Sequence, residues 1–170
     1  MLFDLINLSK LRRTILYALL LAVLFIVQDL AASHVTVFGV RPLLIPAAVV
    51  AVGLLDGGLW GGFFGIAAGF FYDMGCSEHI FLFTVTLAVI GFFVGVLGQF
   101  LFHRGFVSYF VLTIAAIAVV TYCQMFRFLF FTDTDPAAVW RTGLIQFLWS
   151  LPWSIPVYFP CRSIAGQFSR

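Results

Sequence analysis

Long apolar stretches separated by short polar or turn-forming segments run along the whole chain. Each stretch is continuous and does not alternate with a period of two, which favours membrane helices over the strands of a transmembrane barrel. Bounded by polar residues, prolines and glycines, they predict six helices, over residues 14–31, 42–55, 57–72, 80–102, 106–131 and 143–159. No linker separates them, so we predict one domain over residues 1–170.

The second and third predicted helices are short, and the alternative is one continuous helix over residues 42–72. That helix would be about 46 Å long at 1.5 Å per residue. It would need a tilt of about 50° to fit a hydrocarbon core of about 30 Å, which exceeds the usual range. Asp56-Gly57 is a turn-forming dipeptide in the middle of the run. The sequence therefore favours a break at this point.

The composition indicates what surrounds these helices. Of the 170 residues, 63% are hydrophobic and 9% are charged, whereas soluble domains have about 25% charged residues. A chain this small leaves much of its surface facing solvent, so that solvent is expected to be lipid. We predict an all-α integral membrane protein. The net charge of +2 gives no indication of nucleic-acid binding, and the first apolar run is longer than a signal-peptide core, so we expect it to be retained.

Lysine and arginine positions test the number of spans, because cytoplasmic loops carry an excess of both residues. Five spans would place four cationic residues on each side. Six spans, starting inside, leave only Arg41 and Arg141 outside and place six residues inside: Lys10, Arg12, Arg13, Arg104, Arg162 and Arg170. We therefore predict six membrane spans with both termini in the cytoplasm.

Small residues recur at every fourth position through the second and third predicted helices. The repeat consists of Gly53, Gly57, Gly61, Gly65 and Gly69, with Asp73 at the next step. A face without Cβ atoms lets another helix approach closely and gain dispersion contacts, which drive helix association in lipid. We interpret Gly57, Gly61, Gly65, Gly69 and Asp73 as a helix-docking face. The opposing helix could belong to the same chain or to a partner, and alanine is expected to be tolerated at Gly65.

Few polar side chains interrupt the apolar runs. Asp56 and Asp73 each close a predicted helix, where water is available, so we expect a turn or pairing role. In the fifth predicted helix Thr121, Gln124 and Arg127 are spaced by three residues and form a polar stripe. We expect Arg127 to snorkel outward or to pair with an acidic residue such as Asp73. An anionic ligand is the alternative interpretation of this stripe.

No motif for nucleophilic, metal-dependent or phosphate-binding catalysis occurs in the chain. The three histidines are expected on different connections, and the three cysteines lie in separate segments without a C-x-x-C spacing. The sequence therefore predicts no metal, no cofactor and no enzymatic activity.

A basic N-terminus and first apolar run are followed by Arg41-Pro42 and then by a glycine-rich helix. That helix reads GGLWGGFFG over residues 57–65 and ends in GFFYD over residues 69–73. Over roughly residues 14–165 this pattern resembles the MreD family of bacterial rod-shape-determining membrane proteins. The most specific part of the resemblance is Gly61, Gly65, Gly69 and Asp73. The family carries no catalytic motif.

The resemblance implies a multipass protein of the bacterial inner membrane, acting as a non-enzymatic scaffold of the elongation (rod) complex that builds side-wall peptidoglycan. The implied direct partner is an MreC-like protein with a single span and a large periplasmic domain. The implied indirect partners are MreB, RodA and a penicillin-binding transpeptidase. Homo-oligomerisation is left open.

A second interpretation is the substrate-binding component of an energy-coupling-factor vitamin transporter, another small protein with six helices. Ala18-x-x-x-Ala22 in the first predicted helix resembles the alanine motif with which such components dock onto their transporter. This interpretation needs an outward-facing pocket with convergent polar groups, for which the sequence offers the stripe around Arg127 and the outer carboxylates.

Overall fold

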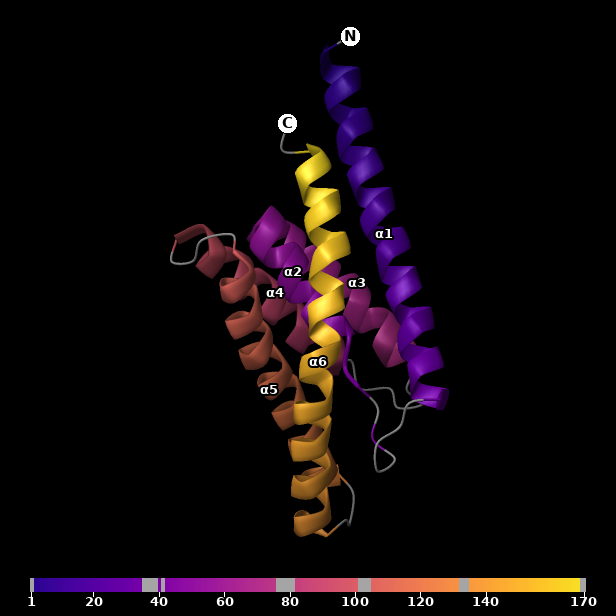
Figure 1. The fold of residues 1–170 in the computed structure, drawn as a ribbon, viewed down its shortest axis with the longest axis vertical. Coiled ribbons are helices and arrows are strands. Elements are labelled where there is room, and N and C mark those ends of the chain that lie inside the picture. Colours follow the sequence, from indigo (N-terminus) through magenta and orange to yellow (C-terminus); the bar gives the residue numbers. More distant parts are fainter. Residues whose placement is uncertain are drawn as a thin grey trace.

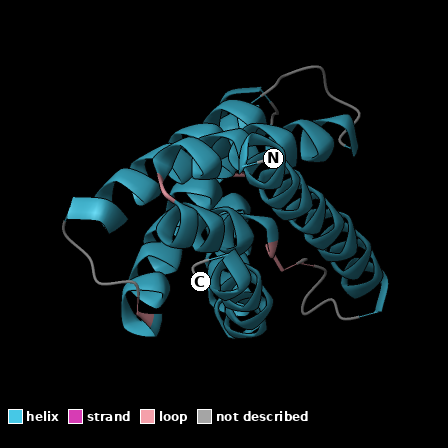
Figure 2. Cartoon of the chain, turned by 90° about the horizontal axis from the view of Figure 1, so that it is seen from above, coloured by secondary structure: helices cyan, strands magenta, loops and turns pink. Residues whose placement is uncertain are grey.

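A computed structural model of the chain describes residues 2–34, 40, 42–75, 82–100, 105–131 and 135–168. In this part of the chain all regular structure is helical, with no strand (Figures 1 and 2). The six helices are α1 (Leu2–His34), α2 (Ile45–Asp56), α3 (Gly58–Gly75), α4 (Leu82–Phe100), α5 (Phe106–Phe131) and α6 (Pro136–Phe168). The predicted all-α architecture with six helices is confirmed. Two helices, over Leu82–Phe100 and Phe106–Phe130, are long and apolar enough to cross a membrane.

The predicted break between the second and third helices is confirmed. Gly57 separates α2 from α3 with a φ of 97°, a conformation that glycine adopts without steric cost because it has no Cβ atom. Its amide donates a hydrogen bond of 2.9 Å to the Gly53 carbonyl, and the Gly57 carbonyl accepts one of 2.9 Å from the Gly61 amide. The turn therefore continues the hydrogen bonding of both helices while the chain changes direction.

Helix α2 forms the centre of the molecule and contacts each of the other five helices. All of its residues from Ile45 to Leu55 are buried. Between residues 47 and 52 it contains only alanine and valine, and such small side chains let surrounding helices approach closely. The core is thus built around the shortest of the six helices.

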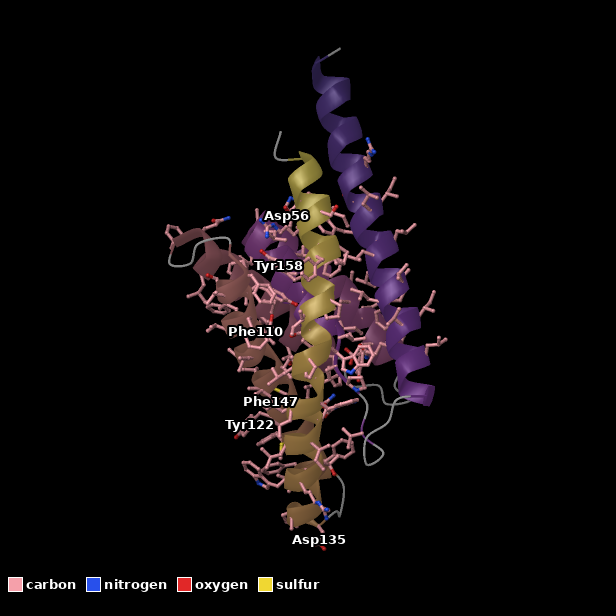
Figure 3. All side chains as sticks on the ribbon, in the orientation of Figure 1. Asp56, Phe110, Tyr122, Asp135, Phe147 and Tyr158 are labelled. Carbon is pink, nitrogen blue, oxygen red and sulfur yellow. The ribbon has the colours of Figure 1, made fainter. Side chains whose placement is uncertain are left out.

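The start of α1 and the end of α6 lie at the same end of the molecule, and the beginning of α6 at Asp135 lies at the opposite end (Figures 1 and 3). Both helices are longer than predicted: α1 starts at Leu2 rather than residue 14, and α6 covers residues 136–168 rather than 143–159. Polar residues at their ends are compatible with helix, so the apolar runs underestimated both lengths.

Three prolines lie inside α6 without ending it, at positions 152, 156 and 160. Each proline lacks the amide that would bond to the carbonyl four residues earlier. Because they are spaced by four, the carbonyls left without these bonds are those of Leu148, Pro152 and Pro156, in one row along the helix. Pro152 and Pro156 are exposed, so the row faces away from the core.

Candidate functional site

The glycine face of α3 lies directly against α4 of the same chain. A Cβ atom built at Gly61 would overlap the Gly91 carbonyl oxygen, and one built at Gly65 would overlap the Leu87 carbonyl oxygen. At Gly69 it would lie 2.7 Å from the Phe83 carbonyl oxygen. The backbones of the two helices therefore touch along the whole face, as the missing Cβ atoms allow.

Helix α4 contributes glycines to the same contact. Cβ atoms built at Gly91 and Gly95 would overlap backbone atoms of Gly61 and Gly58, respectively. A Cβ atom at Gly53 of α2 would lie 2.7 Å from the Gly91 carbonyl oxygen. Three helices thus share one point of close backbone approach, which we call the glycine junction: Gly53, Gly61 and Gly91.

These contacts show which helix covers the glycine face of α3. The face is occupied by α4, so the docking helix belongs to the same chain. The expectation that alanine is tolerated at Gly65 is wrong, because the clash is with backbone, which cannot rotate away as a flexible side chain can. Gly57 contributes mainly through the turn, and its added Cβ would lie 2.5 Å from Gln99 Nε2.

Asp73, at the end of the glycine face, caps the N-terminus of α4. One carboxylate oxygen accepts a hydrogen bond of 3.3 Å from the Phe83 amide. The other accepts bonds of 2.8 Å from the Thr84 amide and 2.7 Å from the Thr84 hydroxyl. A carboxylate at this position satisfies amides that have no partner within the helix and interacts favourably with the helix dipole. Asp73 is 6% exposed, so α3 holds α4 by a buried cap.

The N-terminus of α2 is capped from two other helices, a feature that the sequence analysis missed. Gln28 Oε1 of α1 accepts hydrogen bonds from the amides of Leu44 (3.1 Å) and Ile45 (3.3 Å). Ser150 Oγ of α6 accepts one of 2.9 Å from the Leu43 amide. Buried amides at a helix start need such partners. The available signal was that Gln28 and Ser150 are polar positions within the predicted apolar runs over residues 14–31 and 143–159.

The polar stripe of α5 is described only in part. Thr121 is buried, and its hydroxyl has no hydrogen-bond partner within the described part of the chain. Gln124 lines a cavity of about 250 Å³ between α5 and α6, together with Thr142 and Gln146. The side chain of Arg127 lies outside the described residues. Its pairing with Asp73 remains a prediction, although both oxygens of that carboxylate already accept hydrogen bonds from α4.

An aromatic cluster joins the start of α5 to the C-terminal half of α6. The Tyr109 hydroxyl donates a hydrogen bond of 2.7 Å to the Ser154 carbonyl. The rings of Tyr109 and Tyr158 lie 4.8 Å apart, and Phe106 contacts Tyr158 edge-on at 5.3 Å; Tyr158 is labelled in Figure 3. The Arg162 guanidinium lies 5.9 Å from the centre of the Tyr158 ring. Arg162 thus lies over a ring of its own helix, one turn away.

A groove of about 560 Å³ lies between α1 and α3. The two helices contact each other there through aromatic pairs, Tyr17 with Phe64 and Phe25 with Phe71, each with ring centres 6.0 Å apart. Both members of the Ala18-x-x-x-Ala22 motif line the groove and are exposed. The lining is almost entirely apolar.

Metal-ligating residues do not converge in the part of the chain that the structure describes, where no three His, Cys, Asp or Glu side chains lie close enough to hold an ion. Several candidates lie outside that part: Cys76, Glu78, His79, His103 and Asp133. No family model, no curated protein and no solved structure matches the chain.

Proposed function

We propose that this chain is a non-enzymatic, MreD-like scaffold of the bacterial inner membrane, which crosses the bilayer six times and docks an MreC-like single-span protein during side-wall peptidoglycan synthesis. Through that partner it joins MreB, RodA and a penicillin-binding transpeptidase in the elongation complex. The protein maintains rod shape by holding these partners together.

The observation that carries the proposal is the common role of the four residues that match the family most specifically. Gly61, Gly65 and Gly69 let α4 approach α3, and Asp73 caps the helix that they admit. None of the four offers a group to a substrate, because the glycines have no side chain and both oxygens of Asp73 are engaged. A motif that only assembles helices is suited to a scaffold.

The surface supports the membrane part of the proposal. Large apolar side chains are exposed on every side of the bundle, among them Leu59, Phe100, Val107 and Phe130, each at least 70% exposed. Apolar surface of this extent is stable in lipid and promotes aggregation in water. An even number of passes also agrees with the position of both termini at one end (Figure 1).

The partner is expected on the outer faces of the helices, since α4 already fills the glycine face. Helices associate in lipid through dispersion contacts, so a single span can bind to apolar surface without a polar pocket. Purification of the full chain from its own membrane tests this directly. Stoichiometric recovery of one single-span protein with a large periplasmic domain, and rounded cells on depletion of the chain, are the expected results.

The transporter interpretation predicts a different result from the same purification. A tightly bound small molecule, or a rise in melting temperature with one vitamin in a screen, would replace the scaffold proposal. The cavity beside Gln124 is the place where such a ligand would contact polar groups.

The topology is tested with Cys76, which six spans place on the outer side. A variant with Cys123→Ser and Cys161→Ala keeps this thiol alone. A membrane-impermeant thiol reagent added to intact cells is expected to modify it. Protection of Cys76 in intact cells, together with an external C-terminus, would restore five spans.

A further inference from the structure

The groove between α1 and α3 has one polar end. Because Tyr17 pairs with Phe64 and Phe25 with Phe71, the two helices run in the same direction along it. Thr14 of α1 and Trp60 of α3 therefore lie at the same end. The other end is formed by apolar side chains, including Ile26 and Phe71.

The length of the groove indicates what fits into it. Its lining runs from Thr14 to Ile26 on α1 and from Trp60 to Phe71 on α3, which corresponds to about 18 Å and about 17 Å at 1.5 Å per residue. The hydrocarbon core of a bilayer is about 30 Å thick. The groove thus matches the acyl region of one leaflet, and it is too short to hold a partner's membrane-spanning helix along its whole length.

Positive charge lies at the polar end. Residues 10, 12 and 13 of α1 are lysine and arginines, in the turn just before Thr14, and the Arg12 side chain is exposed. Basic residues beside a membrane helix attract anionic lipid headgroups, and tryptophan is favoured at the level of those headgroups. An apolar groove one leaflet long, with an indole at one end and a basic turn of α1 in the sequence just before that end, has the polarity of a single phospholipid.

We propose that the groove binds one anionic phospholipid, with its acyl chains between α1 and α3 and its phosphate beside the basic turn of α1. The inference rests on the membrane-spanning part of the proposed function and not on the scaffold role. The lipid fills the space beside the aromatic pairs that join the two helices.

Trp60 allows the site to be measured by fluorescence. A full-length variant with Trp140→Phe, Trp149→Phe and Trp153→Phe leaves Trp60 as the only indole. It is placed in nanodiscs of phosphatidylcholine containing a dibrominated lipid, whose bromines quench tryptophan on contact. Dibrominated phosphatidylglycerol is expected to quench Trp60 at an about fivefold lower mole fraction than dibrominated phosphatidylcholine. Native mass spectrometry of the unmodified protein, which is expected to retain one phosphatidylglycerol, gives the same information if the triple variant does not fold.

Matched variants separate a site from general attraction to the bilayer. Lys10→Gln with Arg12→Gln is expected to remove the preference for phosphatidylglycerol. Arg162→Gln, which changes an exposed cation near the end of α6, is expected to keep it. Ala22→Phe fills the groove and is expected to weaken quenching by both lipids, whereas Ala118→Phe on the exposed face of α5 is not.

Equal quenching by the two lipids in the parent protein, or a preference unchanged by Lys10→Gln with Arg12→Gln, overturns the proposal. The proposal is also overturned if an added single-span partner displaces the lipid and Ala22→Phe abolishes binding of that partner. The groove would then hold a protein. Absence of quenching by any brominated lipid rejects both this proposal and the membrane assignment. A lipid preference in a protein that recovers no partner rejects only the scaffold role.

Discussion

Helix α2 and the distal halves of α5 (residues 122–131) and α6 (residues 136–150) are all rich in apolar residues, yet they pack in opposite ways. Every residue of α2 from Ile45 to Leu55 is buried. In the distal halves, by contrast, Tyr122 and Phe130 of α5 and Leu144 and Leu148 of α6 are between 54% and 70% exposed. Tyr122 and Phe147 mark this region in Figure 3.

Side-chain size accounts for the difference. Half of the twelve residues of α2 are alanine or valine, whereas α5 ends in aromatic and long side chains over residues 122–131. In lipid, large apolar side chains gain nothing from burial that the acyl chains do not also provide. Small side chains gain close backbone contact only where another helix covers them. Hydropathy finds both regions, and side-chain size distinguishes α2 from the distal halves of α5 and α6.

The largest effect is expected at the glycine junction. Gly61→Ala places a methyl group against the backbone of α4 and of α2, and overpacking of a close contact costs about 3 kcal/mol. The free energy of unfolding in detergent micelles, measured with a denaturant, should fall by that amount.

Gly62→Ala is the matched control for Gly61→Ala in the same helix. Its added Cβ would lie 3.6 Å from Phe92 Cβ, an ordinary contact. Alanine is a better helix former than glycine by up to about 1 kcal/mol, so this variant is expected to be as stable as the parent or more stable. If both substitutions lowered the free energy of unfolding equally, close backbone approach at Gly61 would not be what stabilises the core.

The second effect concerns the cap on α4. Asp73→Ala leaves two amides and one hydroxyl at the start of that helix without their acceptor, at an expected cost of about 2 kcal/mol. Asp73→Asn keeps one acceptor oxygen and should lose less. A stable Asp73→Ala variant would contradict the cap, and rescue of a damaging Arg127→Leu variant by Asp73→Asn would pair Asp73 with Arg127.

The third effect concerns the cap on α2. Gln28→Leu removes the acceptor of the Leu44 and Ile45 amides. Gln28 accepts two bonds with a neutral oxygen, whereas the Asp73 carboxylate accepts three, so a loss of about 1 kcal/mol is expected. Gln99→Leu replaces an exposed glutamine of α4 and serves as the control. Amide hydrogen exchange at residues 44 and 45 should accelerate in the first variant only.

The sequence contained most of the fold, because apolar runs, a turn dipeptide and a four-residue glycine repeat depend on local chemistry. Asp56-Gly57 marked the break between α2 and α3, and the repeat marked the face that α4 covers. The sequence could not identify α4 as the helix that covers this face, because a face of glycines can be covered by any helix. The sequence also could not predict which amides Gln28 and Ser150 cap. The Leu44 amide is 16 positions from Gln28, and the Leu43 amide is 107 positions from Ser150.

The smallest effect is expected in the exposed region. Phe130 is 70% exposed, so Phe130→Ala removes contacts that lipid or detergent chains replace, and the free energy of unfolding should change by no more than about 0.5 kcal/mol. Phe83→Ala is the reference, because that side chain is 4% exposed and its removal from a packed core costs about 3 kcal/mol or more. A loss above about 1 kcal/mol for Phe130→Ala would mean that another protein segment covers the end of α5. The exposed aromatic side chains near the end of α5 would then form an interface with that segment. They would be packed as tightly as the residues of α2.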